Sequence, residues 1–138
     1  MDMGHMRKDK QKRLLKRLER ILTELRQNWV FVEGRRDKAA LERLGCRKVK
    51  TISGNLRKSC GELDEGVGRV IVLTDLDRRG DELLRSAKGE LEACSKAADT
   101  ETRRRLAGIL RLRNFEDAAR KYDEFMEMIK ETETKEKR

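Results

Sequence analysis

The chain has 138 residues, of which 44% are charged, and its 35 Lys and Arg against 26 Asp and Glu give a net charge of +9. This length suits one domain. The longest apolar runs are about four residues, whereas a membrane-spanning helix needs about 20, so we expect no such helix. The N-terminus has no apolar segment, so we expect no secretory signal.

The positive excess favours an anionic partner, nucleic acid first. A charge-rich, heat-tolerant surface would explain the same composition. Charge alone does not separate these alternatives, so the motifs must decide.

The cysteines Cys46, Cys60 and Cys94 are widely spaced, and the single histidine is His5. Without a CxxC pair or a usable histidine, a zinc site has almost no support. The pattern is typical of a protein in a reducing cytoplasm, which is the location we expect. Residues 1–6 (MDMGHM) resemble an expression remnant, so His5 is given no role.

The first half of the chain shows clear periodicity. Leucines spaced by three and four residues predict an amphipathic helix over 7–27, with a basic opposite face. The apolar run 29–32 predicts a strand buried on both faces. A helix should follow from about Arg36 to Leu44, with Gly45 placed just after its C-cap. Its expected inward residues are Ala39, Ala40, Leu41 and Leu44.

The second half predicts further alternation. We expect a short strand at 49–52, a loop that includes one helical turn at 53–68, and a strand at 69–74. Helices should follow at 79–94 and 102–106, and then either a fourth strand or a helix continuation at 109–113. Asn114 is a good N-cap for the last helix. The inward residues of the 79–94 helix would be Leu83, Leu84, Ala87, Leu91 and Cys94.

Strands that alternate with helices predict the α/β class, with a mainly parallel sheet of three to four strands flanked by helices. We expect one compact domain. It comprises a basic amphipathic helix (1–28), the sheet-containing region (29–113), and a C-terminal amphipathic helix with a charged tail that packs on the same domain (114–138).

Acidic residues follow two of the predicted strands. Glu33 ends the first, and Asp75 and Asp77 follow the third. Ligands of open parallel sheets bind beyond the carboxyl ends of the strands. If these strands are neighbours, the three carboxylates converge, and Mg²⁺ would relieve their repulsion. Residues two apart in an extended turn point the same way, so Asp75 and Asp77 can address one ion.

Glycines and arginines flank these acids. Gly34 and Gly80 would allow close backbone approach. Guanidinium groups around a metal cluster suit a phosphodiester, and the candidate nucleic-acid contacts are Arg35, Arg36, Arg57, Lys58, Arg78 and Arg79. Simpler roles exist: Asp37 is as well explained as an N-cap or first-turn acid, and a lone Asp-x-Asp motif is a weak signal.

Two segments carry a resemblance. Val-Glu-Gly-x-x-Asp-x-x-Ala-Leu (32–41) and Leu-Thr-Asp-x-Asp-x-x-Gly (73–80) resemble the two signatures of the Toprim family, over roughly residues 29–91. The whole chain is similar to small stand-alone archaeal Toprim proteins, and to the Toprim ribonuclease that matures 5S ribosomal RNA. The resemblance implies a Rossmann-like three-layer sandwich, with Glu33 as general acid/base or metal ligand. It implies that Asp75 and Asp77 bind Mg²⁺, and that Gly34, Asp37 and Gly80 complete the site.

Two functions remain open. The first is a Mg²⁺-dependent nuclease for RNA or DNA, with Mn²⁺ as a substitute metal. The second is a non-catalytic nucleic-acid-binding module or a subunit of a larger processing complex, in which the basic first helix and Arg103, Arg104 and Arg105 dock phosphates or partners. Topoisomerase chemistry would need a tyrosine, and Tyr122 falls on an apolar stripe. The terminal helices could also pair with a protein partner or a second copy, and no membrane role is expected.

Overall fold

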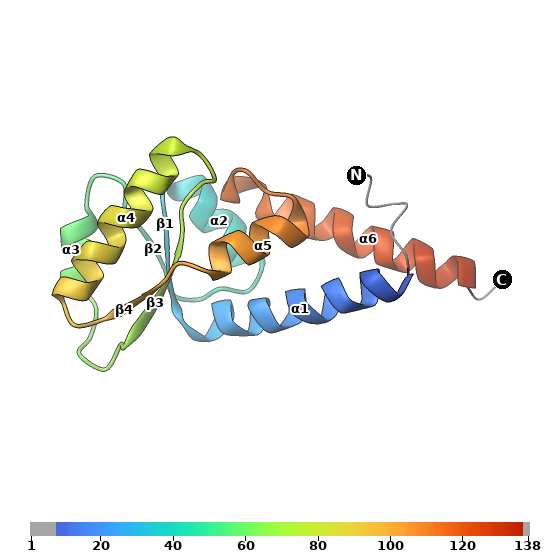
Figure 1. The fold of residues 1–138 in the computed structure, drawn as a ribbon, viewed down its shortest axis with the longest axis horizontal. Helices are drawn as coiled ribbons and strands as arrows, with labels where there is room; N and C mark the ends of the chain where they lie inside the picture. The colour runs from blue at the N-terminus through green and yellow to red at the C-terminus, as the bar shows by residue number, and fades with distance from the viewer. Residues whose placement is uncertain (1–7, 137–138) are drawn as a thin grey trace.

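The structure is a computed structural model that describes residues 8–136, so the expectations for residues 1–6 lie outside the described residues. The elements follow the predicted alternation of helix and strand (Figure 1). In chain order they are α1 (Lys8–Gln27), β1 (Trp29–Val32), α2 (Arg35–Arg43), β2 (Val49–Thr51), α3 (Leu56–Gly61), β3 (Arg69–Leu73), α4 (Arg78–Ala93), β4 (Ala97–Asp99), α5 (Thr102–Leu110), the 3₁₀ turn η2 (Phe115–Asp117) and α6 (Ala118–Glu136).

The strands form one parallel sheet in the order β2-β1-β3-β4. Val32 pairs with Thr51 on one side and with Leu73 on the other, so β1, β2 and β3 end at the same level. This sheet confirms the predicted α/β class and the three-layer, Rossmann-like arrangement. It also places the two acid-bearing strand ends side by side.

Each face of the sheet has its own core, because alternate side chains of a strand point to opposite faces. Val30 and Val32 pack with the leucines of α1 and with residues of α2, α5 and α6. Phe31 packs on the other face, with residues of α3 and α4. Figure 1 shows the sheet between α3 and α4 on one side and α1, α5 and α6 on the other. None of the helices within residues 8–136 is both long and apolar enough to span a membrane.

Of the two alternatives for 109–113, the helix continuation holds, and the fourth strand lies elsewhere. It is Ala97–Asp99, which pairs with the edge of β3. The segment 109–113 instead continues α5 as far as Leu110. Sequence patterns missed β4 because this three-residue edge strand carries no β-branched or aromatic side chain.

Two predicted inward residues are exposed. Ala39 is exposed because the buried stripe of α2 runs through Asp37, Ala40 and Leu41. Cys94 is exposed because α4 ends at Ala93 and the chain turns away through Ser95, which has a φ of 60°. Gly45 is placed as predicted, since its φ of 98° suits the position after a C-cap. Asn114 instead precedes η2 without a side-chain capping bond, and the last helix begins only at Ala118. The segment 53–68 contains the six-residue helix α3, which is longer than the one turn expected.

Candidate functional site

The order of the strands in the sheet reverses between the carboxyl ends of β1 and β3. β1 continues outward to β2 on one side, and β3 lies on its other side. α2, which follows β1, packs on one face, whereas α4, which follows β3, packs on the other. The first turns of these helices therefore diverge, and such a switch point is the usual ligand site of open α/β sheets.

Glu33 and Asp75 are joined at this point. Glu33 follows β1, and its Oε1 accepts a 3.0 Å hydrogen bond from the backbone N–H of Asp75. The Asp75 carboxylate turns toward the start of η2, where its Oδ1 accepts a 3.0 Å bond from the Phe115 N–H. Both side chains are half-buried. Hydrogen bonds to backbone thus hold the two predicted acids beside each other.

Asp77 has a structural role that the sequence did not reveal. It is the N-cap of α4, and its Oδ1 accepts a 2.7 Å bond from the Gly80 N–H. Gly80 is required by sterics, since a Cβ there would lie 1.8 Å from the carbonyl oxygen of Asp75. The Thr74 hydroxyl also donates to the Gly80 carbonyl at 2.7 Å. The predicted close approach at Gly80 is therefore confirmed.

Gly34 and Asp37 form the corresponding turn after β1. The Gly34 N–H donates to Asp37 Oδ2 at 3.0 Å, so Asp37 in the first turn of α2 reaches back to the N-cap backbone. The close approach predicted at Gly34 is wrong, because its backbone is extended and a Cβ would meet only the Asp37 carboxylate, at 4.0 Å. The capping interpretation of Asp37 is the one that the structure displays.

The carboxylates perturb one another. Burial raises the pKa of Glu33, and the neighbouring charges of Asp75, Asp77 and Asp37 raise it further against the opposing Asp75 N–H bond. Burial likewise raises the pKa of Asp75, with Asp77 and Glu116 adding to it, while the Phe115 N–H and Arg103 oppose the rise. Like charges that raise each other's pKa show that the carboxylates share one electrostatic environment.

The donor chemistry of this cluster fits a hard cation. Within residues 8–136, no group of three or more His, Cys, Asp or Glu side chains could hold a metal ion as the side chains are placed. In those residues, the second carboxylate oxygens of Glu33, Asp75 and Asp77 have no hydrogen-bond partner. Mg²⁺ binds through one or two carboxylates and retains water. Burial is the main cause of these raised pKa values, and a divalent cation would offset the repulsion that adds to it.

Two residues beside the carboxylates, Arg103 and Glu116, have roles that the sequence did not predict. Arg103 is buried, donates to the carbonyl oxygens of Thr74 at 2.7 Å and Asp75 at 2.6 Å, and pairs with Asp81 at 2.7 Å. It therefore holds the turn after β3, and the expectation that Arg103 docks phosphates is wrong. Glu116, on η2, adds negative charge beside Asp75. Neither carries a sequence signal, since their partners lie far away along the chain.

The predicted basic contacts are exposed, and several already have partners. Arg35 and Arg36 open α2, and Arg78 and Arg79 open α4, so both pairs flank the acids. Arg57 and Lys58 lie on α3. Four of the six are near carboxylates: Arg36 with Glu116 at 4.0 Å, Arg57 with Glu90 at 3.8 Å, Lys58 with Glu62 at 4.0 Å, and Arg78 with Glu82 at 3.5 Å. Such exposed pairs are weak and exchangeable.

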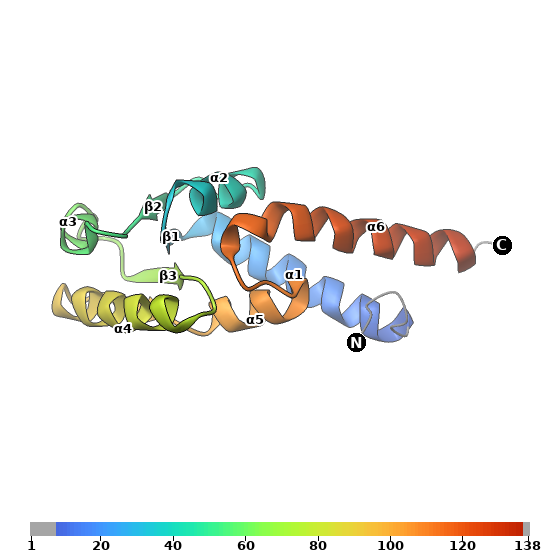
Figure 2. The ribbon, with the colours of Figure 1, turned by 90° about the horizontal axis from the view of Figure 1, so that it is seen from above.

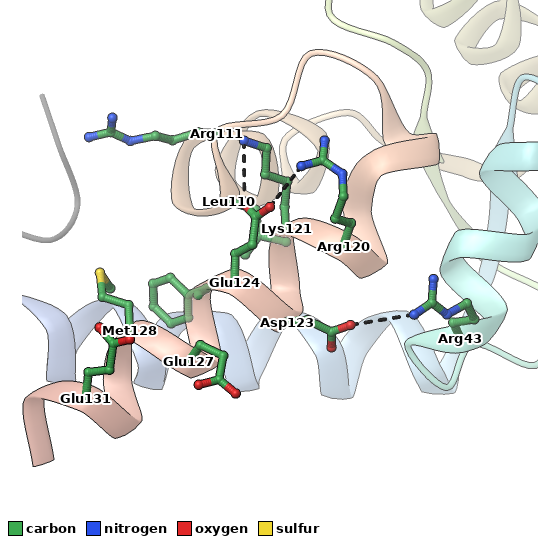
Figure 3. Close-up of a pocket in the computed structure, with 11 residues that line it drawn as sticks. Arg43, Leu110, Arg111, Arg120, Lys121, Asp123, Glu124, Glu127, Met128 and Glu131 are labelled. Carbon is green, nitrogen blue, oxygen red and sulfur yellow. Dashed lines mark hydrogen bonds and ion pairs between the residues drawn. The ribbon is translucent and has the colours of Figure 1, made fainter. Parts of the chain in front are cut away.

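A separate cavity of about 840 Å³ lies along α6, and Figure 3 shows its lining. Asp123 faces Arg43 across it at 3.6 Å, and Glu124 pairs with Arg120 and Lys121. Acids and bases alternate there, so its charge is largely balanced. Tyr122, on the same helix, packs against the core, as its apolar spacing predicted.

Comparison with known proteins identifies relatives of this chain. The UPF0292 protein of Pyrococcus horikoshii is 39% identical over 94 residues, which are 66% of this chain and 71% of the relative. That of Thermococcus onnurineus is 36% identical over 97 residues, covering 68% and 73%. A solved structure of a putative protein from Aquifex aeolicus shares the fold, with a TM-score of 0.64 and 25% identity over 72% of this chain and 96% of that one. No protein-family model matches the chain.

Proposed function

We propose that this chain, which belongs to the UPF0292 family, is a Mg²⁺-dependent nuclease of the Toprim type that hydrolyses phosphodiester bonds in RNA or DNA in the cytoplasm. The observation that carries the proposal is the meeting of Glu33, Asp75 and Asp77 at the switch point of a parallel sheet. In a protein that only binds phosphate, carboxylates gathered there would repel the ligand.

Each acid has a distinct part in this proposal. Asp75 and Asp77 would hold Mg²⁺ through their second oxygens, and Glu33 would act as base or as a further ligand. Bound Mg²⁺ would neutralise a phosphate oxygen and favour attack by water. Glu33 would take the proton of that water as its oxygen bonds to phosphorus. The ester P–O bond would break, and the leaving oxygen would take a proton from solvent. Its raised pKa suits this role, since a general base works best when its pKa approaches the operating pH.

The flanking arginines would position the substrate. Arg35 and Arg79 have no ion pair within residues 8–136, so they are ready to contact the phosphates on either side of the acids. Arg36 and Arg78 would exchange a weak carboxylate pair for a phosphate. Guanidinium groups bind phosphate oxygens in a bidentate manner, which would hold the bond in place for attack.

A non-catalytic binding module is the second candidate. It is favoured by the structural hydrogen bonds of the acids, because Asp77 and Asp37 both cap helices and would be useful without a metal. Incubation of labelled single-stranded, duplex and hairpin RNA and DNA, with Mg²⁺, Mn²⁺ or a chelator, separates the two. Metal-dependent cleavage supports the nuclease. Binding with no cleavage of any substrate would favour the module.

A further inference from the structure

A second basic surface lies away from the strand ends, between α1 and α5. These helices are in contact, and they lie next to each other in both views (Figures 1 and 2). Between them is a groove of about 550 Å³. Four arginines line it, two from each helix, together with apolar residues such as Ile21 and Ile109, and the lining contains no acidic residue. We call it the arginine groove, and its cationic members are Arg17, Arg20, Arg104 and Arg105.

The four guanidinium groups are exposed and have no ion pair or hydrogen bond within residues 8–136. This separates them from Arg36, Arg57 and Arg78, which each face a carboxylate. It also separates the arginine groove from the cavity of Figure 3, where Arg43, Arg120 and Lys121 each pair with an acid. Unpaired like charges gathered in one groove repel each other, and an anionic ligand would relieve that repulsion.

We infer that the arginine groove binds the sugar–phosphate backbone of a nucleic-acid duplex. Guanidinium groups from two helices can contact several phosphates at once, which suits a polyanion better than a single phosphate. The lining includes no aromatic side chain. Proteins that hold unpaired strands stack bases on aromatic rings, so the groove suits a paired helix whose bases stay covered.

The arginine groove is connected to the carboxylates by the first turn of α5. Arg103 in that turn holds the carbonyl oxygen of Asp75 at 2.6 Å, and the next two residues line the groove. A duplex bound to Arg104 and Arg105 would thus have a fixed position relative to the turn that carries Asp75. This inference rests on the proposed function, because it assigns to the same enzyme a substrate class and a second contact.

The test is duplex binding in the presence of a chelator, where no cleavage takes place. Fluorescence anisotropy of a labelled duplex over a salt series would compare wild type with the double variant Arg17→Gln/Arg104→Gln. Each lost phosphate contact lowers the slope of log K against log salt by about 0.9, so the double variant should lose about 1.8. The matched control is Arg85→Gln/Lys88→Gln on α4, which removes equal charge from the opposite face.

The control should keep the wild-type slope, and a labelled single strand of equal length should bind more weakly than the duplex. An equal loss of slope in both double variants would overturn the inference, as would an unchanged slope in Arg17→Gln/Arg104→Gln. Tighter binding to the single strand, or to anionic phosphatidylserine vesicles with no duplex binding, would also overturn it. Loss of cleavage in Glu33→Gln with intact duplex binding would support duplex binding by the arginine groove. An absence of cleavage by wild type would contradict the proposed nuclease activity but not the binding inference.

Discussion

Glu33 accepts a 3.0 Å hydrogen bond from the backbone N–H of Asp75, a residue 42 positions later in the chain. The donor is backbone, so the bond does not depend on the side chain at 75. The acceptor is one carboxylate oxygen, which a glutamine carbonyl at 33 can replace. The variants Glu33→Gln and Asp75→Asn should therefore remove negative charge while keeping the fold, and they separate chemistry from stability.

We expect Gly80→Ala to destabilise the protein by about 1–3 kcal/mol, the usual range for forced overpacking. A Cβ at this position would lie 1.8 Å from the Asp75 carbonyl oxygen, so the turn that carries the acid must move. Gly89→Ala is the matched control, because it lies on the same helix with nothing within 4 Å. The control should gain up to about 1 kcal/mol from helix propensity. Urea denaturation measures both, and equal stability of the two variants would contradict the steric argument.

Replacing Arg103 should be far more harmful than replacing its exposed neighbour. Arg103→Met leaves the carbonyl oxygens of Thr74 and Asp75 without their donor, at a cost of about 1–3 kcal/mol for each buried group. Arg104→Met should change stability by less than about 0.5 kcal/mol, since Arg104 is exposed. Thermal unfolding followed by circular dichroism compares them. Similar melting temperatures would show that Arg103 does not support the turn.

Two variants of Asp77 distinguish its role as a helix cap from its proposed role as a metal ligand. Asparagine is a good N-cap, so Asp77→Asn should keep the Gly80 contact and nearly all the stability, whereas Asp77→Ala should lose about 1 kcal/mol. Bound Mg²⁺ should stabilise the wild type by about 2.7 kcal/mol at a hundred times its Kd. Both variants should lose much of that gain because a carboxylate ligand is gone. A full Mg²⁺ response in Asp77→Asn would leave the residue with only its capping role.

The pH dependence of stability should reveal the raised pKa of Asp75. The folded-state pKa of Asp75 is raised above its ordinary value of 3.8, mainly by burial and then by Asp77 and Glu116. The folded protein therefore holds the Asp75 proton more tightly than the unfolded chain does. The contribution of Asp75 to the free energy of unfolding consequently falls as pH rises from 3.8 through the raised pKa. Asp75→Asn should gain stability relative to wild type over that window. A difference independent of pH would contradict the shift.

The strand ends could be predicted because two independent patterns coincide there. Residues 29–32 and 70–73 are apolar runs with β-branched side chains, and acids follow each run, so both strands and the edge where their acids meet were predicted. β4 and the buried Arg103 were not, because a three-residue strand has little pattern and the partners of Arg103 are backbone carbonyls 28 and 29 residues away. The arginine groove likewise exists only once α1 and α5 pack together.

Metal-dependent cleavage by the wild type and three variants tests the central proposal most directly. The comparison would use Glu33→Gln, Asp75→Asn and the exposed loop control Glu65→Gln, on the substrate that wild type cleaves best, over a Mg²⁺ series. The proposal predicts that Glu33→Gln and Asp75→Asn lose at least about a hundredfold in rate, the scale of acid–base catalysis, while folding normally. Glu65→Gln should match wild type. Undiminished Mg²⁺-dependent cleavage by Glu33→Gln and Asp75→Asn would contradict it.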